Sequence, residues 1–258
     1  MKFPSINSHY LAALVLLIMA AILIVIAILT NRGDFTSAAL VISGLVCLLM
    51  GIFFATLSGS DPINLQYLSL FPVQGSINLT RACADLGIQG NAHIIPNGRN
   101  GMTRTMQFLP VAVYNGAPLP MDSFVTGTDT AGLLMEPSCA PLLRLLREGE
   151  KLQIPSDMTA LHGLIKELGV EVLEVAKRVH STDDGEIITI TMEDYRLIGG
   201  CRAMTFESPK CCIANPCPVC SLFATVFAEG TGKVIQVERC EPDSKISTVN
   251  AVFSVLHE

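Results

Sequence analysis

The sequence predicts an α+β fold, in which a transmembrane hairpin of two helices precedes a soluble domain with an antiparallel sheet. Three observations predict it: two long apolar runs near the start, one strongly periodic helix, and β runs that alternate with helices and end in a hairpin. The predicted organisation is a hairpin over residues 1–58, a connector over 59–75 and a soluble domain over 76–258. The soluble domain allows a division into two subdomains, 76–150 and 151–258.

The first 57 residues predict the membrane anchor. Tyr10–Thr30 holds 21 residues without a charge and Phe35–Leu57 holds 23, whereas a helix needs about 20 apolar residues to cross the hydrocarbon core. The polar residues 31–34 between them are too few for anything but a reversal of direction. The first run is also longer than the apolar core of a signal peptide, and no Ala-x-Ala cleavage pattern follows it. We therefore expect a multi-pass protein of the cell membrane, with spans over about 10–30 and 35–57.

Small residues recur every seven positions in both runs and predict a close helix–helix seam. Residues seven apart share one helical face, and small side chains let two backbones approach. The seam is expected between the two spans, or between protomers of a homo-oligomer. Neither run contains Asp, Glu, Lys, Arg or His, which disfavours ion or proton transport. The small residues are Ala13, Ala20 and Ala27 in the first run and Ser37, Gly44, Gly51 and Ser58 in the second.

Charge limits the partners and the compartment of the soluble domain. From Asp61 onward 22 acidic residues face 15 lysines and arginines, a net charge of −7. Such a domain repels phosphate backbones, so nucleic acid is not an expected partner. Lys2 slightly favours both ends of the hairpin in the cytoplasm. The cysteines of the domain fit a reducing compartment, because a domain of this size folds without disulfides.

The soluble domain is predicted to alternate helices and strands. Residues 156–177 carry the clearest 3.6-residue apolar stripe, and the turn 183–185 leads into an alternating strand. Pro110 places its strand near a sheet edge, because proline cannot donate to a ladder. The expected helices are 76–86, 141–147, 156–177 and 219–228; the expected strands are 91–95, 103–113, 132–135, 186–192, 233–239 and 246–256, with a long loop over 114–130.

A cysteine cluster near the end of the chain is the strongest chemical signal. Four cysteines fall between residues 211 and 220, and Cys201 and Cys240 flank them. The spacing Cys212-x4-Cys217-x2-Cys220 is that of a plant-type iron–sulfur loop. With Cys240 as a fourth ligand, the same thiolates could instead close a tetrahedral zinc site. The predicted metal ligands are therefore Cys212, Cys217, Cys220 and Cys240, with zinc or an iron–sulfur cluster as the cofactor.

Two other interpretations of the cysteines stay open. Cys217-Pro-Val-Cys220 opens a predicted helix, whose dipole lowers the pKa of the first thiol and favours redox chemistry. In thioredoxin-like proteins, however, that motif follows a buried strand, whereas residues 207–216 predict a loop. The third interpretation is structural, because cysteine packs as a small apolar residue.

No catalytic set is predicted, so the sequence does not indicate an enzyme. His93, His162 and His180 are scattered, and each fits a surface or core residue better than a ligand. No serine lies in a Gly-x-Ser-x-Gly elbow. Residues 230–233 contain glycine and lysine but follow a helix and enter a strand, the reverse of a phosphate-binding loop.

Two stretches carry a resemblance to known families, Ala82–Pro96 and Pro216–Val237. With the hairpin before them, they resemble a family of uncharacterised archaeal membrane proteins that carry a cytoplasmic α+β module. The second stretch also resembles the end of 4-vinyl-reductase-type ligand-binding domains, in which a cysteine-containing helix packs on an antiparallel sheet around a small molecule. The resemblance implies a membrane-anchored, non-enzymatic binding or sensing module; the alternatives are a membrane-tethered metal protein and a thiol redox protein.

Overall fold

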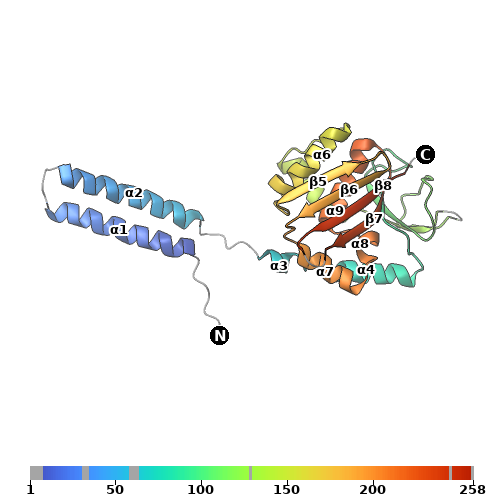
Figure 1. The fold of residues 1–258 in the computed structure, drawn as a ribbon, viewed down its shortest axis with the longest axis horizontal. Coiled ribbons are helices and arrows are strands. Elements are labelled where there is room, and N and C mark those ends of the chain that lie inside the picture. Colours follow the sequence, from blue (N-terminus) through green and yellow to red (C-terminus); the bar gives the residue numbers. More distant parts are fainter. Residues whose placement is uncertain (1–7, 31–34, 58–63, 128–129, 244–245, 257–258) are drawn as a thin grey trace. The chain divides into compact units, whose positions relative to one another are not determined.

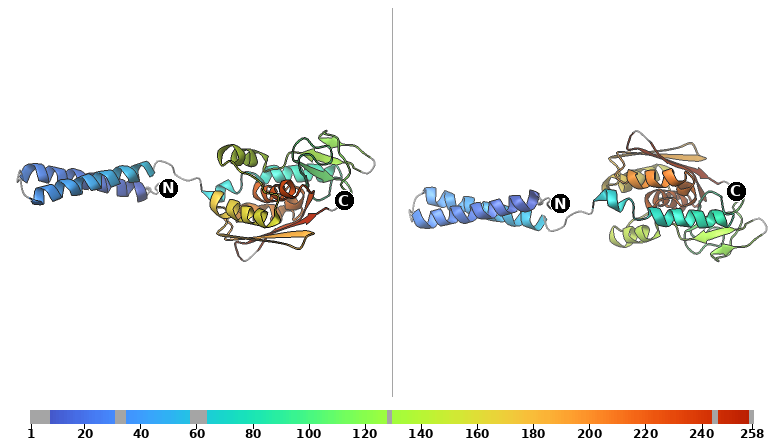
Figure 2. Two further views of the ribbon diagram at one scale, coloured as in Figure 1. Left: turned by 90° about the horizontal axis from the view of Figure 1, so that it is seen from above. Right: turned by 90° about the horizontal axis from the view of Figure 1, so that it is seen from below.

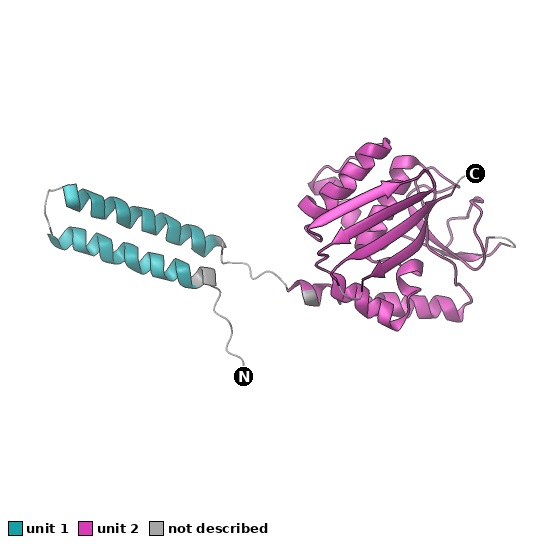
Figure 3. Cartoon of the chain, viewed as in Figure 1, with its two compact units in different colours: residues 1–63 teal, residues 64–258 magenta. Residues whose placement is uncertain are grey.

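The computed structural model of the chain contains two compact units, residues 1–63 and 64–258 (Figure 3). The predicted reversal at 31–34 and the first part of the predicted connector, 59–63, lie outside the described residues, as does Ser58. The structure describes residues 8–30, 35–57, 64–127, 130–243 and 246–256.

The first unit consists of two antiparallel helices, α1 (Ser8–Thr30) and α2 (Phe35–Leu57) (Figure 1). Both are long and apolar enough to cross a membrane, and most of their large side chains are exposed. The small residues form the contact between them: Ala20 is 1% exposed, and a Cβ on Gly44 would lie 2.9 Å from Ile24 Cγ1. The predicted seam between the two helices is confirmed, because only small residues let these backbones approach so closely.

The second unit is a mixture of helices and strands, as predicted. A one-turn π-helix, η1 (Leu168–Val172), follows the helix α6. The α-helices are α3 (Leu65–Leu68), α4 (Val73–Asp85), α5 (Ala140–Gly149), α6 (Met158–Glu167), α7 (Ile198–Glu207), α8 (Cys211–Ala214) and α9 (Pro218–Thr231). The strands are β1 (His93–Ile95), β2 (Met106–Pro110), β3 (Phe124–Val125), β4 (Gly132–Met135), β5 (Arg178–Asp183), β6 (Ile187–Glu193), β7 (Ile235–Pro242) and β8 (Val249–Val255).

The eight strands form one sheet in the order β3-β4-β2-β1-β7-β8-β6-β5, and every pairing is antiparallel. The predicted antiparallel sheet is therefore confirmed. In its register, Ala251 of β8 lies between Ile190 of β6 and Cys240 of β7. The strands β6 and β8 bury alternate residues, so one face of this half of the sheet packs on the core and the other is polar.

Helix α9 runs through the middle of this unit, with β5–β8 on one side of it (Figure 2). Ten of its 14 residues are buried, from Val219 to Ala228. Pro218 suits the first helical turn, where a missing N–H costs nothing, and Gly232 ends the helix in the left-handed conformation with φ 65°. The longer segment Cys211–Thr231, which includes α9, also has the length and hydropathy of a membrane span. However, 83% of its most apolar stretch is buried inside the unit.

A second, smaller core covers the opposite face of β1 and β2. Phe108 and Met106 point into it, and the segment that follows β2 closes over them with Tyr114, Leu119 and Val125. All residues of β1 and β2 are consequently buried. The described part of the predicted loop, residues 114–127, is thus a cover for the sheet, and it contributes the short strand β3.

The position expected for Pro110 is wrong. Its strand β2 lies inside the sheet, between β1 and β4, and not near an edge. Pro110 is the last residue of that strand and pairs with Gly132. Its carbonyl accepts a hydrogen bond from the backbone N–H of Gly90 at 3.0 Å. A proline is tolerated there because the ladder ends at that residue.

The long predicted helix 156–177 is shorter in the structure. Helix α6 ends at Glu167 and continues only as the π-helical turn η1. Gly169 lies in that turn against β5, where a Cβ would come within 2.7 Å of Val179 Cγ2. The strand β5 and the helices α7 and α8 were not predicted from the sequence.

We expect the packing of α9 to determine the stability of this unit. Replacing the fully buried Phe223 by alanine should lower the free energy of unfolding by about 3–5 kcal/mol, because it removes a large apolar side chain and leaves a cavity. The matched change Phe206→Ala, at a side chain that is 93% exposed, should cost less than about 0.5 kcal/mol. Urea unfolding of the full chain in detergent measures both. Equal effects of the two variants would contradict this description of the core.

Candidate functional site

The structure brings five cysteines together at the start of α9. They come from α7, α8, α9 and β7, and three pairs of neighbouring thiols are close enough to shift each other's pKa: Cys201 with Cys217, Cys217 with Cys220, and Cys220 with Cys240. Burial raises the pKa of the Cys212 thiol, and the nearby thiols of Cys217 and Cys240 raise it further. The four cysteines predicted from spacing therefore meet, and Cys201 joins them.

Local backbone geometry aims Cys240 into this cluster. In β7 the buried residues alternate at Ile235 and Val237, so a regular strand would next bury Arg239. A register shift between Val237 and Arg239 breaks the alternation, and Cys240 becomes the buried residue instead. A β-bulge re-aims side chains in this way. The bulge keeps the guanidinium in water and places a thiol against the helices.

Cys217 is the electrostatic centre of the cluster. It is the N-cap residue of α9, and the thiols of Cys201 and Cys220 lie beside its sulfur. The neighbouring thiols of Cys201 and Cys220 hold the pKa of Cys217 well below its usual value, despite desolvation by burial. The interaction with the Cys217 sulfur, together with burial, raises the pKa of Cys201 and of Cys220. The arrangement therefore stabilises one thiolate among neutral thiols.

An apolar pocket of about 490 Å³ lies against this cluster. Cys201 and Cys217 form part of its wall, and Tyr195 is the one large polar side chain among its lining residues. Burial raises the pKa of Tyr195 well above its usual value, so its hydroxyl stays neutral. The other lining residues are Leu68, Ser69, Phe71, Pro72, Val73, Leu197, Gly200, Met204, Pro218 and Val219.

A glycine lets the pocket form. Gly200 of α7 lies against residue 69, and a Cβ at this position would collide with the carbonyl oxygen of Ser69. Residues 68–73 can therefore approach α7 and form one wall of the pocket. Neither α7 nor this wall was predicted, so Tyr195, Cys201 and Met204 were missed as site residues. The paired glycines 199 and 200 are the only local signal of a close approach that the sequence offers.

The cysteines do not form a ready metal site. Within the part of the chain that the structure describes, no group of three or more His, Cys, Asp or Glu side chains is placed to hold a metal ion. A structural zinc site needs four ligands in a tetrahedron, each within about 2.3 Å of one point. Metal binding by Cys212, Cys217, Cys220 and Cys240 thus stays a prediction.

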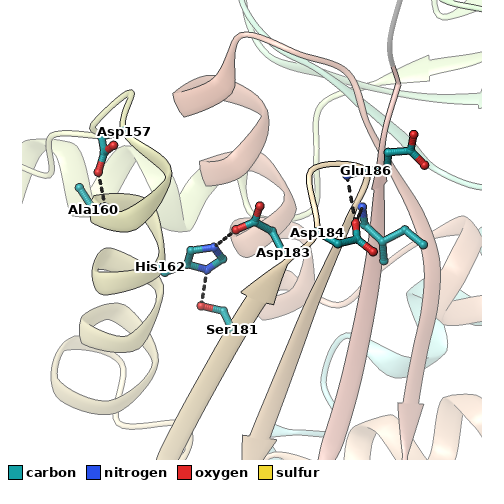
Figure 4. Close-up of polar contacts among 8 residues, drawn as sticks. Asp157, Ala160, His162, Ser181, Asp183, Asp184 and Glu186 are labelled. Atoms are coloured by element: carbon teal, nitrogen blue, oxygen red, sulfur yellow. Dashed lines mark hydrogen bonds and ion pairs between the residues drawn. The ribbon is translucent and has the colours of Figure 1, made fainter.

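His162 links a helix to the sheet. Its Nδ1 lies 2.7 Å from Ser181 Oγ and its Nε2 lies 2.7 Å from Asp183 Oδ2 (Figure 4). Ser181 and Asp183 are two residues apart on β5 and therefore share a face. Although these residue types occur in hydrolase triads, none of the three lines the apolar pocket. They join α6 to β5, while His180, between the two partners in sequence, is exposed.

His93 is buried beside the second core. In the sheet it pairs with Gln236 of β7, four residues before Cys240. Its ring lies edge-on to that of Tyr114, with centroids 5.3 Å apart, and its Nδ1 is 2.8 Å from the carbonyl oxygen of Asn91. Burial lowers the pKa of His93, because the charged imidazolium loses its hydration there.

The lowered pKa of His93 makes the stability of the folded chain depend on pH, and the sign of this dependence follows from the direction of the shift. Because the pKa of His93 is lower in the folded chain than its ordinary value of about 6.5, stability is complete above that pH and falls as the pH drops toward the folded pKa. The slope from this one group should reach at most about 1.4 kcal/mol per pH unit. Unfolding of His93→Gln between pH 7.5 and about 5 should lose that slope, and His180→Gln should keep it. If stability varied with pH equally in His93→Gln and in the parent chain, this pH dependence would not come from His93.

No protein-family model, no curated protein and no solved structure matches the chain. The similarity to 4-vinyl-reductase-type domains accordingly stays a prediction.

Proposed function

We propose that the chain is a membrane-anchored, non-enzymatic binding or sensing module whose ligand is an apolar small molecule. The apolar pocket beside the thiol cluster carries this proposal. Its volume of about 490 Å³ falls in the range of small-molecule sites, which is about 300–1,000 Å³. Such sites typically combine an apolar wall with a few polar groups that orient the ligand. Here Tyr195 and the thiols of Cys201 and Cys217 are those groups.

The first unit supplies the anchor in this proposal. Its two helices have the length and hydropathy of membrane spans, and neither contains a charged residue. With both ends of the hairpin in the cytoplasm, the second unit lies in a reducing compartment. This location fits the nine cysteines of the chain, all of which are free thiols.

The position of the pocket in the sequence suggests how binding would be sensed. One wall, residues 68–73, belongs to the first described segment after α2, and the opposite wall comes from α7 and the start of α9. A ligand between them would fix the start of the second unit against its core. Ligand binding would then change the stability of the segment through which this unit is tethered, since a ligand stabilises the state that it binds.

A neutral fluorescent probe tests the pocket. The full chain in detergent should bind 1-aminoanthracene with a rise in fluorescence, because the probe is apolar and fits a cavity of this size. Leu197→Trp places a bulky ring in the pocket wall and should weaken binding about tenfold or more, as expected for steric exclusion worth at least about 1.4 kcal/mol. The control Leu145→Trp, at an exposed position of α5, should bind as the parent chain does.

Thermal unfolding of both variants shows that they are folded. Equal probe binding by folded Leu197→Trp and by the parent chain would overturn the proposed site.

Metal binding is a second candidate function, and the convergence of five cysteines favours it. Cys217 supplies a stabilised thiolate, which is the form that binds metal. Cys212, Cys220 and Cys240 would complete a set of four ligands for zinc or an iron–sulfur cluster. Coordination would draw their protons away, since the ligands must be deprotonated. A thiol redox protein that uses Cys217 and Cys220 is the remaining alternative, because both residues open the same helix.

Metal analysis separates these candidates. If the cluster binds metal, the full chain purified without oxygen should carry near-stoichiometric zinc, or iron and sulfide with visible absorption. The double variant Cys217→Ser, Cys220→Ser should lose this metal, because two ligands are gone. Cys83→Ser should retain it, since Cys83 lies on α4 outside the cluster. A folded, metal-free chain would reject the metal function, and a Cys217–Cys220 disulfide after mild oxidation would then favour redox chemistry.

A further inference from the structure

A second cavity, of about 360 Å³, shares no lining residue with the apolar pocket. It lies between α5, the second half of α9 and the segment that leads into β2. Both cavities use α9, but one takes Cys217–Val219 and the other takes Thr225 and Glu229. Glu229 follows Cys217 by twelve residues, which corresponds to about 18 Å along the helix. The two cavities are thus separate sites on the same helix.

The walls of this charged cavity hold three arginines and two glutamates. Arg144 and Arg147 come from α5, where a spacing of three residues places them on one helical face. Arg104 comes from the segment before β2. The cavity is therefore locally positive by one charge, on a chain whose overall charge is −6. A cleft with charge of one sign attracts ligands of the other.

The carboxylates do not saturate the guanidinium groups. Glu136 is shared: one of its oxygens contacts Arg104, and the other lies 3.7 Å from Arg144 Nη1. That separation is an ion pair but is too long for a hydrogen bond. Glu229 is likewise divided between Arg147 and the hydroxyl of Thr105, which donates to it at 2.6 Å. Arg144 is thus the cation with the weakest carboxylate contact in this group, and a guanidinium offers five N–H donors.

The floor of the cavity is neutral. Cys139 and Thr225 are fully buried there, with 3.3 Å between Cys139 Sγ and Thr225 Oγ1. Leu143 and Pro137 add apolar surface beside them. The cavity accordingly offers a cationic rim over an uncharged floor, which suits a ligand with an anionic group at one end and a small neutral body at the other.

We infer that this cavity binds a small molecule that carries a carboxylate or phosphate group, with the anionic oxygens at Arg144 and its neighbouring arginines. Arginine recognises both groups through paired N–H···O bonds. The volume of about 360 Å³ lies within the range of small-molecule sites, which is about 300–1,000 Å³. This inference does not depend on the function proposed above, because the two cavities have no residue in common.

Calorimetric titration of the full chain in neutral detergent tests the inference, with inorganic phosphate and succinate as probes at low salt. At least one probe should bind. Arg144→Gln should weaken that binding about tenfold, as the loss of one charge-assisted hydrogen bond does. Arg178→Gln should leave it unchanged, because Arg178 is similarly exposed but pairs with Glu193 away from the cavity. Glu136→Gln should strengthen it, since it frees two guanidinium groups.

The two probes distinguish the ligand classes: binding of phosphate alone indicates a phosphate ester, and binding of succinate alone indicates a carboxylate. Absence of heat for both probes up to about 10 mM would overturn the inference. It would also be overturned if Arg144→Gln and the parent chain bound equally, or if Glu136→Gln weakened binding.

Discussion

The burial of α9 is the constraint on which the second unit depends. An apolar helix with ten consecutive buried residues has to be covered on all sides. Strands on one side and α5 and α6 on others provide that cover, with Phe223, Phe227 and Leu161 fully buried. The hydrophobic effect thus places the elements, and both cavities lie beside this helix.

The two ends of α9 differ in chemistry. At its start, the N-cap residue Cys217 lies beside the thiols of Cys201 and Cys220, and this environment lowers its pKa and favours negative charge on sulfur. Further along, Glu229 accepts from Thr105 and pairs with Arg147. An apolar pocket adjoins the first position and a charged cavity adjoins the second. Since α9 is buried and lines both cavities, a ligand bound at either one, as we propose, would contact the same core helix.

Much of the architecture follows from patterns in the chain. The apolar runs predict the two long helices, and the spacing of their small residues predicts the seam between them. The alternation of apolar residues predicts the strands β6 and β8. The missed elements have weak signals. Helix α7 contains two glycines and little amphipathicity, and β5 is largely polar because it is an edge strand of the sheet. Their conformations depend on neighbours that are distant in the sequence.

For the thiol cluster, the sequence by itself determined that the site is made of cysteines and which three of them lie close together. The spacing of Cys212, Cys217 and Cys220 is local, so their proximity could be inferred from the chain. The tertiary structure decided the rest. Cys201 and Tyr195 reach the cluster through unpredicted segments, Cys240 faces it because of a bulge, and Arg104 meets Arg144 and Arg147 across a cavity. These contacts join segments far apart in sequence, and only packing around α9 brings such segments together.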